Sequence, residues 1–173
     1  MSHHPTERLF FALWPNSSIR QAINEQSHSV IQEINGKIVP AENWHITLAF
    51  LGTVDQSTKD CMQQVAATIQ NHPFTLSLDE LGYWSNSRIL WLGASQKPEA
   101  LMELVNSLNT DLQRCGYRPE KRPFRVHLTL MRKAFPVKTL PPITPIIWTV
   151  EYFCLVRSTI QPNGASYEVI ARW

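Results

Sequence analysis

The sequence lacks any long apolar run. No stretch of about 18 or more uninterrupted apolar residues occurs among its 173 residues, so no membrane-spanning helix is predicted. The N-terminus also lacks a charged segment that leads into an apolar stretch with a small-residue cleavage site. With 43% hydrophobic and 17% charged residues, the composition is typical of one soluble globular domain. We expect a cytoplasmic protein without membrane contact.

Cysteine is also scarce. The three cysteines, Cys61, Cys115 and Cys154, are widely separated, odd in number and in no CxxC pair. This pattern argues against both a disulfide framework and a zinc site. We therefore expect reduced cysteines that mostly serve as packing residues.

Several catalytic and cofactor motifs are absent. There is no GxSxG elbow and no GxxxxGK[ST] phosphate loop, which argues against a serine hydrolase of that type and a P-loop protein. No Asp, Glu or Cys lies within four residues of His127 or, after His45, at a spacing suited to a shared metal ion. The sequence therefore argues against a metal site at either histidine. We expect neither a metal nor another cofactor.

The formal charge of +2 is too small to indicate a nucleic-acid partner, but the charge is unevenly distributed. One segment carries seven basic residues against the single acid Glu120; they are Arg114, Arg118, Lys121, Arg122, Arg125, Arg132 and Lys133. This basic segment is either an anion-binding face or a solvated surface, and the pattern alone does not decide this for any one residue.

Strand and helix patterns are interleaved along the chain. Strands are predicted over residues 8–14, 44–51, 74–78, 88–93, 124–131, 146–156 and 166–170, and helices over 19–34, 55–70 and 98–115. Ser17 or Ser18 is the expected N-cap of the first helix, Gly52 should end the second strand, and Gly116 should cap the third helix. Residues 82–87 should form a loop and 140–145 an irregular connection. No linker divides the chain, so we expect one domain over residues 1–173, with helices covering sheets.

Two short motifs repeat in the two halves of the chain. They are His45-Ile46-Thr47-Leu48 and His127-Leu128-Thr129-Leu130. In a strand, alternate side chains share a face, so each motif presents one imidazole and one hydroxyl on one surface. Either motif alone is unremarkable, but chance would produce such a pair only about once in four hundred sequences of this composition. The repetition indicates a duplication that places matching strands side by side about a pseudo-twofold axis.

Two histidines suit the hydrolysis of a cyclic phosphodiester. Imidazole titrates near neutrality, so one can accept a proton from water while the other donates one to the departing ribose oxygen. Thr47 and Thr129 lie two residues from their histidines, about 6.6 Å along each strand, and their hydroxyls can donate hydrogen bonds to non-bridging phosphate oxygens.

At these residues the chain resembles the two-histidine phosphoesterase superfamily, and most of all its bacterial RNA 2',3'-cyclic phosphodiesterase branch, also called the 2'-5' RNA ligase family. Further landmarks of the resemblance are Leu9-Phe10-Phe11-Ala12, Trp91-Leu92-Gly93 and Arg122-Pro123-Phe124. The resemblance implies an α+β, bilobal fold with two antiparallel sheets around a central cleft and helices on the outside. It also implies hydrolysis of RNA 2',3'-cyclic ends to 2'-phosphomonoesters, with His45 as proton donor and His127 as proton acceptor.

Four further residues are candidates for binding the substrate. Arg132 matches a basic position of the family, and Arg125 lies in the basic segment just before the second motif. Phe11 and Phe50 could stack on a terminal base, although lone aromatics on strands are at least as often part of the core. The expected partner is RNA with a 2',3'-cyclic end, tRNA fragments included, bound by a monomer.

Two alternatives stay open. One is a related reaction on another cyclic or 2'-5' phosphodiester, including reversible 2'-5' ligation of RNA. The other belongs to a different class: an RNA-binding module that uses the basic segment and exposed aromatics without chemistry.

Overall fold

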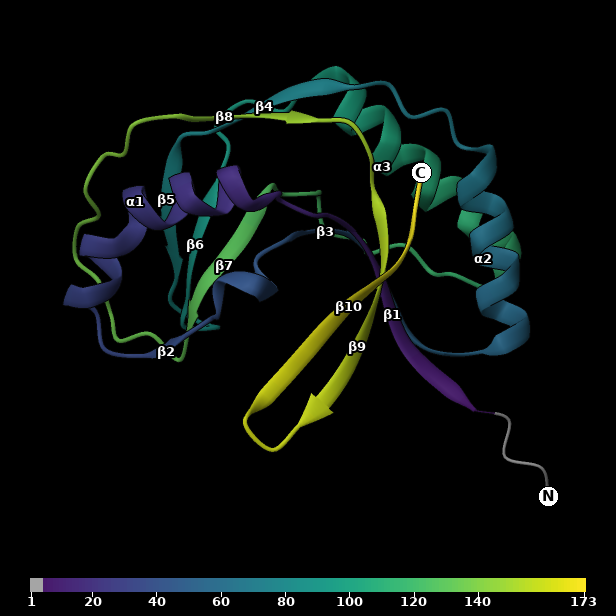
Figure 1. Cartoon of the computed structure of the whole chain (residues 1–173), viewed down its shortest axis with the longest axis horizontal. Coiled ribbons are helices and arrows are strands. Elements are labelled where there is room, and N and C mark those ends of the chain that lie inside the picture. The colour runs from purple at the N-terminus through teal and green to yellow at the C-terminus, as the bar shows by residue number, and fades with distance from the viewer. Residues whose placement is uncertain (1–4) are drawn as a thin grey trace.

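The computed structural model describes residues 5–173 of the chain. Within them the strands are β1 (Thr6–Leu13), β2 (Lys37–Ile38), β3 (Ile46–Asp55), β4 (Phe74–Leu78), β5 (Glu80–Trp84), β6 (Ile89–Gly93), β7 (His127–Arg132), β8 (Ile146–Val150), β9 (Cys154–Gln161) and β10 (Gly164–Arg172). The helices are α1 (Ser17–Glu33), α2 (Gln56–Thr68) and α3 (Glu99–Asp111), and short 3-10 turns cover Ala41–Asn43 and Leu112–Cys115. Figure 1 shows their arrangement.

The strands of this described part form two antiparallel sheets. The larger sheet has the order β10-β9-β1-β3-β7-β6-β5, with β2 paired to β7, and the smaller consists of β4 and β8. Helices α2 and α3 pack on the half that contains β3, while α1 contacts β8. The expected α+β class with two antiparallel sheets is therefore confirmed.

The two halves of the larger sheet meet between β3 and β7. A single residue pair, Ile46 opposite Leu128, joins these antiparallel strands. Both residues hold the second position of their His-x-Thr-Leu motif, so equivalent positions of the repeat face each other. The matching strands are thus neighbours, as the duplication predicts, and a local twofold relates them.

Helix ends follow ordinary capping chemistry, with one shift from the sequence expectation. The side chain of Asn16, and not Ser17 or Ser18, caps α1 by accepting a hydrogen bond from the amide of Ile19 at 3.0 Å. Gly116 caps the turn after α3 in a left-handed conformation with φ of +85°, which confirms its predicted role.

Several predicted strands have different bounds. The strand predicted over 146–156 is two strands in different sheets, because the chain turns at residues 151–153, where Phe153 is fully buried. Residues 82–84 of the loop predicted over 82–87 belong to β5, which pairs with β6, and residues 85–87 form the turn between the two strands. Gly52 does not end its strand: it has φ of +74° and lies at a bulge, after which β3 continues to Asp55. The strand predicted from residue 124 begins at His127.

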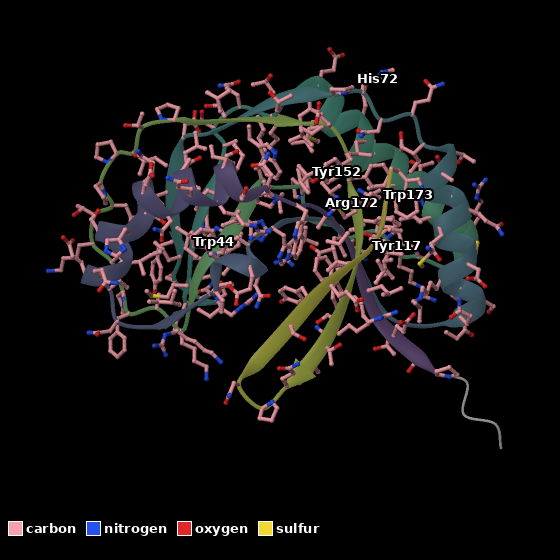
Figure 2. The ribbon with its side chains drawn as sticks, in the orientation of Figure 1. Trp44, His72, Tyr117, Tyr152, Arg172 and Trp173 are labelled. Atoms are coloured by element: carbon pink, nitrogen blue, oxygen red, sulfur yellow. A yellow bond between two sulfur atoms is a disulfide. The ribbon has the colours of Figure 1, made fainter. Side chains whose placement is uncertain are left out.

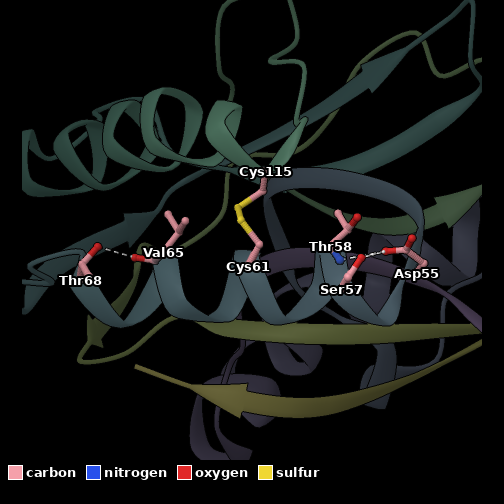
Figure 3. Close-up of a disulfide and its surroundings, with 7 residues drawn as sticks. All are labelled: Asp55, Ser57, Thr58, Cys61, Val65, Thr68 and Cys115. Atoms are coloured by element: carbon pink, nitrogen blue, oxygen red, sulfur yellow. Dashed lines mark hydrogen bonds between the residues drawn. A yellow bond between two sulfur atoms is a disulfide. The ribbon is translucent and has the colours of Figure 1, made fainter.

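Cys61 on α2 and Cys115 in the turn after α3 form a disulfide, with their Cα atoms 5.8 Å apart (Figure 3). The expectation of reduced cysteines is wrong for this pair. Helix α2 packs against the turn that contains Cys115, but 54 residues separate the two cysteines in sequence, so their spacing does not predict the contact. Cys154 is free and buried, as a packing residue should be, and burial raises the pKa of its thiol to about 11.

Within residues 5–173, no helix combines the length and apolar character needed to cross a membrane.

Candidate active site

The junction of the two halves brings the motif histidines together. His45 directly precedes β3 and His127 is the first residue of β7, and the residues that follow them pair across the two strands. The charge of a protonated His127 disfavours protonation of His45, so the two imidazoles are within electrostatic reach of each other.

Both imidazoles are held by the same local hydrogen bond. Nδ1 of His45 donates to the backbone oxygen of Asn43 at 2.6 Å, and Nδ1 of His127 donates to that of Arg125 at 3.1 Å. A carbonyl oxygen only accepts, so Nδ1 carries the proton in each ring. Nε2 of each histidine is therefore the atom left to accept or donate a proton.

His45 lies in an aromatic cage. Its ring centroid is 4.7 Å from that of Phe10, 5.1 Å from Tyr167 and 5.7 Å from Trp14, which stacks nearly parallel to it. Burial lowers the pKa of His45 to about 4, because the cage excludes the water that would solvate an imidazolium. The hydrogen bond to Asn43 opposes this effect. In the free protein near pH 7, His45 is neutral.

His127 has a less enclosed setting. Trp84 on β5 meets its ring edge to face, with centroids 4.8 Å apart, and Trp84 in turn packs on Trp91. Burial also lowers the pKa of His127, while its hydrogen bond to Arg125 opposes the shift. The positive charge of Arg132 lowers the pKa of both histidines further, which brings Arg132 within electrostatic reach of the pair.

A β-bulge follows the threonine on β3. Adjacent residues of β1 pair with Thr47 and Ala49, which leaves Leu48 as the extra residue. Leu48 and Ala49 are both buried, so the alternation of faces shifts by one position. Phe50 consequently shares the face of Thr47, and its side chain is 47% exposed.

The same bulge recurs on β7. Adjacent residues of β6 pair with Thr129 and Met131, which leaves Leu130 as the extra residue. Leu130 and Met131 are both buried, so the exposed Arg132 returns to the face of Thr129. Strict alternation would have put Arg132 on the opposite face. The bulge thus accounts for its electrostatic effect on the histidines.

Of the remaining sequence candidates, one is wrong. Phe11 is fully buried and packs against Phe153 and Trp173, with ring centroids 5.9 Å from each, so it cannot stack on a substrate. Arg125 is exposed, and its backbone oxygen holds His127.

Sequence reasoning missed the aromatic residues that contact the histidines. Phe10, and not Phe11, faces His45, because the register with β9 places Phe10 beside Val156 on that side of the sheet. The run Leu9-Phe10-Phe11-Ala12-Leu13 is apolar throughout, so it carries no alternation that would reveal its orientation. Tyr167 and Trp84 come from strands distant in sequence, and no local pattern marks them.

The described residues contain no group of three or more His, Cys, Asp or Glu side chains that could hold a metal ion. The ring neighbours of His45 are Phe10, Trp14 and Tyr167, and that of His127 is Trp84, none of which is a metal ligand of the usual kind. A tetrahedral metal would lack ligands beyond the two imidazoles.

Comparisons with known proteins match nearly the whole chain. The family model for the 2'-5' RNA ligase superfamily matches residues 15–159. The RNA 2',3'-cyclic phosphodiesterase of Escherichia coli K12 is 36% identical over 169 residues, which is 96% of each chain, and that of Archaeoglobus fulgidus is 29% identical over 93% of this chain and 96% of its own. The crystal structure of E. coli LigT complexed with 3'-AMP superposes with a TM-score of 0.88 at 35% identity and covers 98% of both chains. The chain belongs to the 2'-5' RNA ligase superfamily.

Proposed function

We propose that this protein hydrolyses RNA 2',3'-cyclic phosphate ends to 2'-phosphomonoesters without a metal. The observation that carries the proposal is the pair of histidines from neighbouring strands, each with Nδ1 bound to a backbone carbonyl and Nε2 left for proton transfer. The relatives named RNA 2',3'-cyclic phosphodiesterase over nearly the full chain support the same reaction.

In the proposed reaction the histidines have complementary roles. Nε2 of His127 accepts a proton from water as the water oxygen bonds to phosphorus. The bond from phosphorus to the ribose 3' oxygen breaks, and Nε2 of His45 donates the proton that this oxygen takes up. Thr47 and Thr129 donate hydrogen bonds to the non-bridging oxygens, where negative charge develops. Each proton transfer contributes about 10² to 10⁴ in rate.

The low pKa of His45 is compatible with its role as donor. The substrate phosphodiester is an anion, and an anion between the two imidazoles favours the imidazolium form. Binding of the substrate itself therefore supplies the charge that stabilises a protonated His45. The free protein, without that anion, keeps the ring neutral.

Three residues are proposed to bind the rest of the substrate end. Arg132, within electrostatic reach of both histidines, pairs with the phosphate. Phe50 offers an exposed ring for a base, and Arg125 places an exposed guanidinium beside the second motif. The proposed unit is the single domain of residues 1–173, active as a monomer in the cytoplasm, on RNA ends that include tRNA fragments.

A substrate panel tests the proposal. Oligonucleotides with a 2',3'-cyclic end, linear 2'-5' dinucleotides and pairs of RNA ends for ligation are incubated with the protein, and 2'- and 3'-phosphate products are separated by chromatography. We expect 2'-phosphate from the cyclic end, a loss of about 10² to 10⁴ in rate for His45→Ala and for His127→Ala, and full activity in EDTA.

Two results would contradict this reading. Activity that EDTA abolishes and a divalent metal restores would replace the two-histidine mechanism with a metal-dependent one. Binding of RNA that survives both alanine substitutions, with no turnover by the parent protein, would identify a binding module instead.

A further inference from the structure

A hollow lies along the second half of β3, the half that ends at Asp55. Its walls come from β3 at residues 50, 51 and 53–55, from Thr58 and Met62 of α2, and from residues 115–118, and its volume is about 540 Å³. Among residues 5–173, no strand pairs with this edge of β3 beyond Ile46. On this edge the part of β3 from Ala49 to Val54 therefore has no strand partner among these residues, which is the usual condition for an added ligand or strand.

The basic segment connects this hollow to the active site. Because β3 and β7 are antiparallel and meet at Ile46 and Leu128, the chain that enters His127 comes from the side toward which β3 runs. That chain is the basic segment: Arg118 lines the hollow at one end, and Arg132 faces the histidines at the other. The segment thus has one arginine in the wall of the hollow and another within electrostatic reach of the histidines.

The chemistry of the hollow suits a nucleotide. Phe50 presents a ring that is 47% exposed, and the guanidinium of Arg8 lies 5.0 Å from its centroid. Arg118 is exposed at the wall. Exposed aromatics next to arginines are the usual platform for single-stranded nucleic acid.

The one acidic residue in the wall of the hollow, Asp55, caps a helix. Asp55 caps α2 by accepting hydrogen bonds from the amide of Thr58 at 2.8 Å and the hydroxyl of Ser57 at 3.0 Å (Figure 3). Its charge is offset by the helix N-terminus. The disulfide of Cys61 and Cys115 ties α2 to the segment that contains Arg118, so it limits how far these two walls can separate.

We propose that this hollow is a second nucleotide subsite, which holds the nucleotide on the 5' side of the cyclic end. A 2',3'-cyclic phosphate occupies the last ribose, so any further RNA lies on its 5' side. Phe50 and Thr47 pair with Phe10 and Ala12, which are two residues apart on β1, so the two lie about 7 Å apart along the strand. In this proposal Phe50 stacks on the penultimate base, and Arg118 pairs with a backbone phosphate. The inference rests on the proposed function.

The test compares a nucleoside 2',3'-cyclic monophosphate with a trinucleotide that has the same cyclic end. The measured quantity is the ratio of kcat/KM for the trinucleotide to kcat/KM for the mononucleotide. We expect Phe50→Leu to lower this ratio about tenfold or more, because one stacking contact is lost. The matched control is Phe135→Leu, since Phe135 is 58% exposed and also lies by an arginine, Arg88, but is not part of the hollow.

Salt dependence tests the phosphate contact. For the trinucleotide, the slope of log kcat/KM against log salt concentration should become shallower by about 0.7 in Arg118→Gln, which is the value for one phosphate contact on a single strand. Arg114→Gln removes the same charge from an exposed position outside the hollow, and we expect it to keep the parent slope.

An unchanged ratio of kcat/KM values in Phe50→Leu together with an unchanged salt slope in Arg118→Gln would overturn the proposal. The unpaired edge of β3 would then be a candidate site for pairing with a strand of another protein. If the parent turns over neither substrate, the proposed function fails separately. The subsite is then decided by the affinity for a trinucleotide with a 2'-phosphate end, measured by calorimetry: Phe50→Leu must weaken it about tenfold, and an equal affinity refutes the subsite.

Discussion

The two histidines should give different pH optima for kcat/KM and kcat. In the free protein, burial lowers the pKa of His45 to about 4 and that of His127 below its ordinary 6.5. The proposed mechanism needs one proton shared by the pair, and the free protein holds that proton only below a pH of about 6.5. The optimum of kcat/KM, which reports the free protein, is therefore expected on the acid side of 6.5.

Substrate binding should move the optimum of kcat to higher pH. A phosphodiester anion about 4 Å from the imidazole of His45, at an effective dielectric constant of about 20, favours the imidazolium by about 4 kcal/mol. This is comparable to the effect of burial, so substrate binding should return the pKa of His45 in the complex from about 4 toward its ordinary value. We expect the optimum of kcat to exceed that of kcat/KM by about one unit or more.

Steady-state kinetics on a nucleoside 2',3'-cyclic monophosphate between about pH 4 and 9 measures both optima. A nuclear magnetic resonance titration of His45, with and without a nucleoside 2'-monophosphate, follows the same shift directly. Coincident optima at pH 7 or above would refute the reasoning. So would a His45 that titrates at its ordinary value in the free protein, since the aromatic cage would then not exclude water.

Four more predictions concern single sites. Thr47→Val should keep the fold by circular dichroism but lower kcat about 100-fold, as expected for one lost donor to the developing charge. Cys61→Ala, compared with the oxidised parent in urea melts, should cost about 4 kcal/mol of unfolding free energy, the value for a loop closed over 54 residues. Reductant should bring the parent close to the variant, and a parent insensitive to reductant would show that the disulfide does not form. Gly82→Ala should destabilise by about 1–3 kcal/mol in the same assay, because its Cβ would lie 2.0 Å from the ring of Trp91. The unfolded chain protonates His45 at higher pH than the folded protein does. The free energy of unfolding should therefore fall by about 3 kcal/mol as pH drops from 6.5 to 4, and this group should cause no further change below that. A flat profile in urea melts over this range would contradict the burial of the ring.

The sequence predicts the histidine pair because the information is local and repeated. A His, an aliphatic residue, Thr and Leu follow one another in each half, and strand geometry then orients the imidazole and hydroxyl together. The same rule fails for Phe10 and Phe11. Their neighbours are apolar on both sides, and only the pairing of β1 with β9 decides which ring faces His45. Local sequence patterns do not predict contacts between strands that are distant in sequence.

The disulfide and the split of the strand predicted over residues 146–156 fail for a related reason. Cys61 and Cys115 each sit on a regular apolar stripe, so their spacing looks like ordinary packing. The apolar run after Pro145 likewise suits one long strand, and only the burial of Phe153 against Phe11 and Trp173 shows where it turns. In both cases the deciding partner is more than 50 residues away or in another sheet.

The two bulges give equivalent positions of the repeat different chemistry. Phe50 follows Thr47 by three residues, and Arg132 follows Thr129 by three residues, each returned to the face of its threonine by one extra residue. The twofold that relates the histidines therefore also relates an aromatic ring to a guanidinium. Two histidines related by a twofold do not themselves define a direction for the substrate, because exchanging them gives the same pair. A ring on one side and a cation on the other do define one, since a base prefers the ring and a phosphate prefers the cation. On the proposed function, the direction in which RNA crosses the pair therefore depends on Phe50 and Arg132 more than on the histidines.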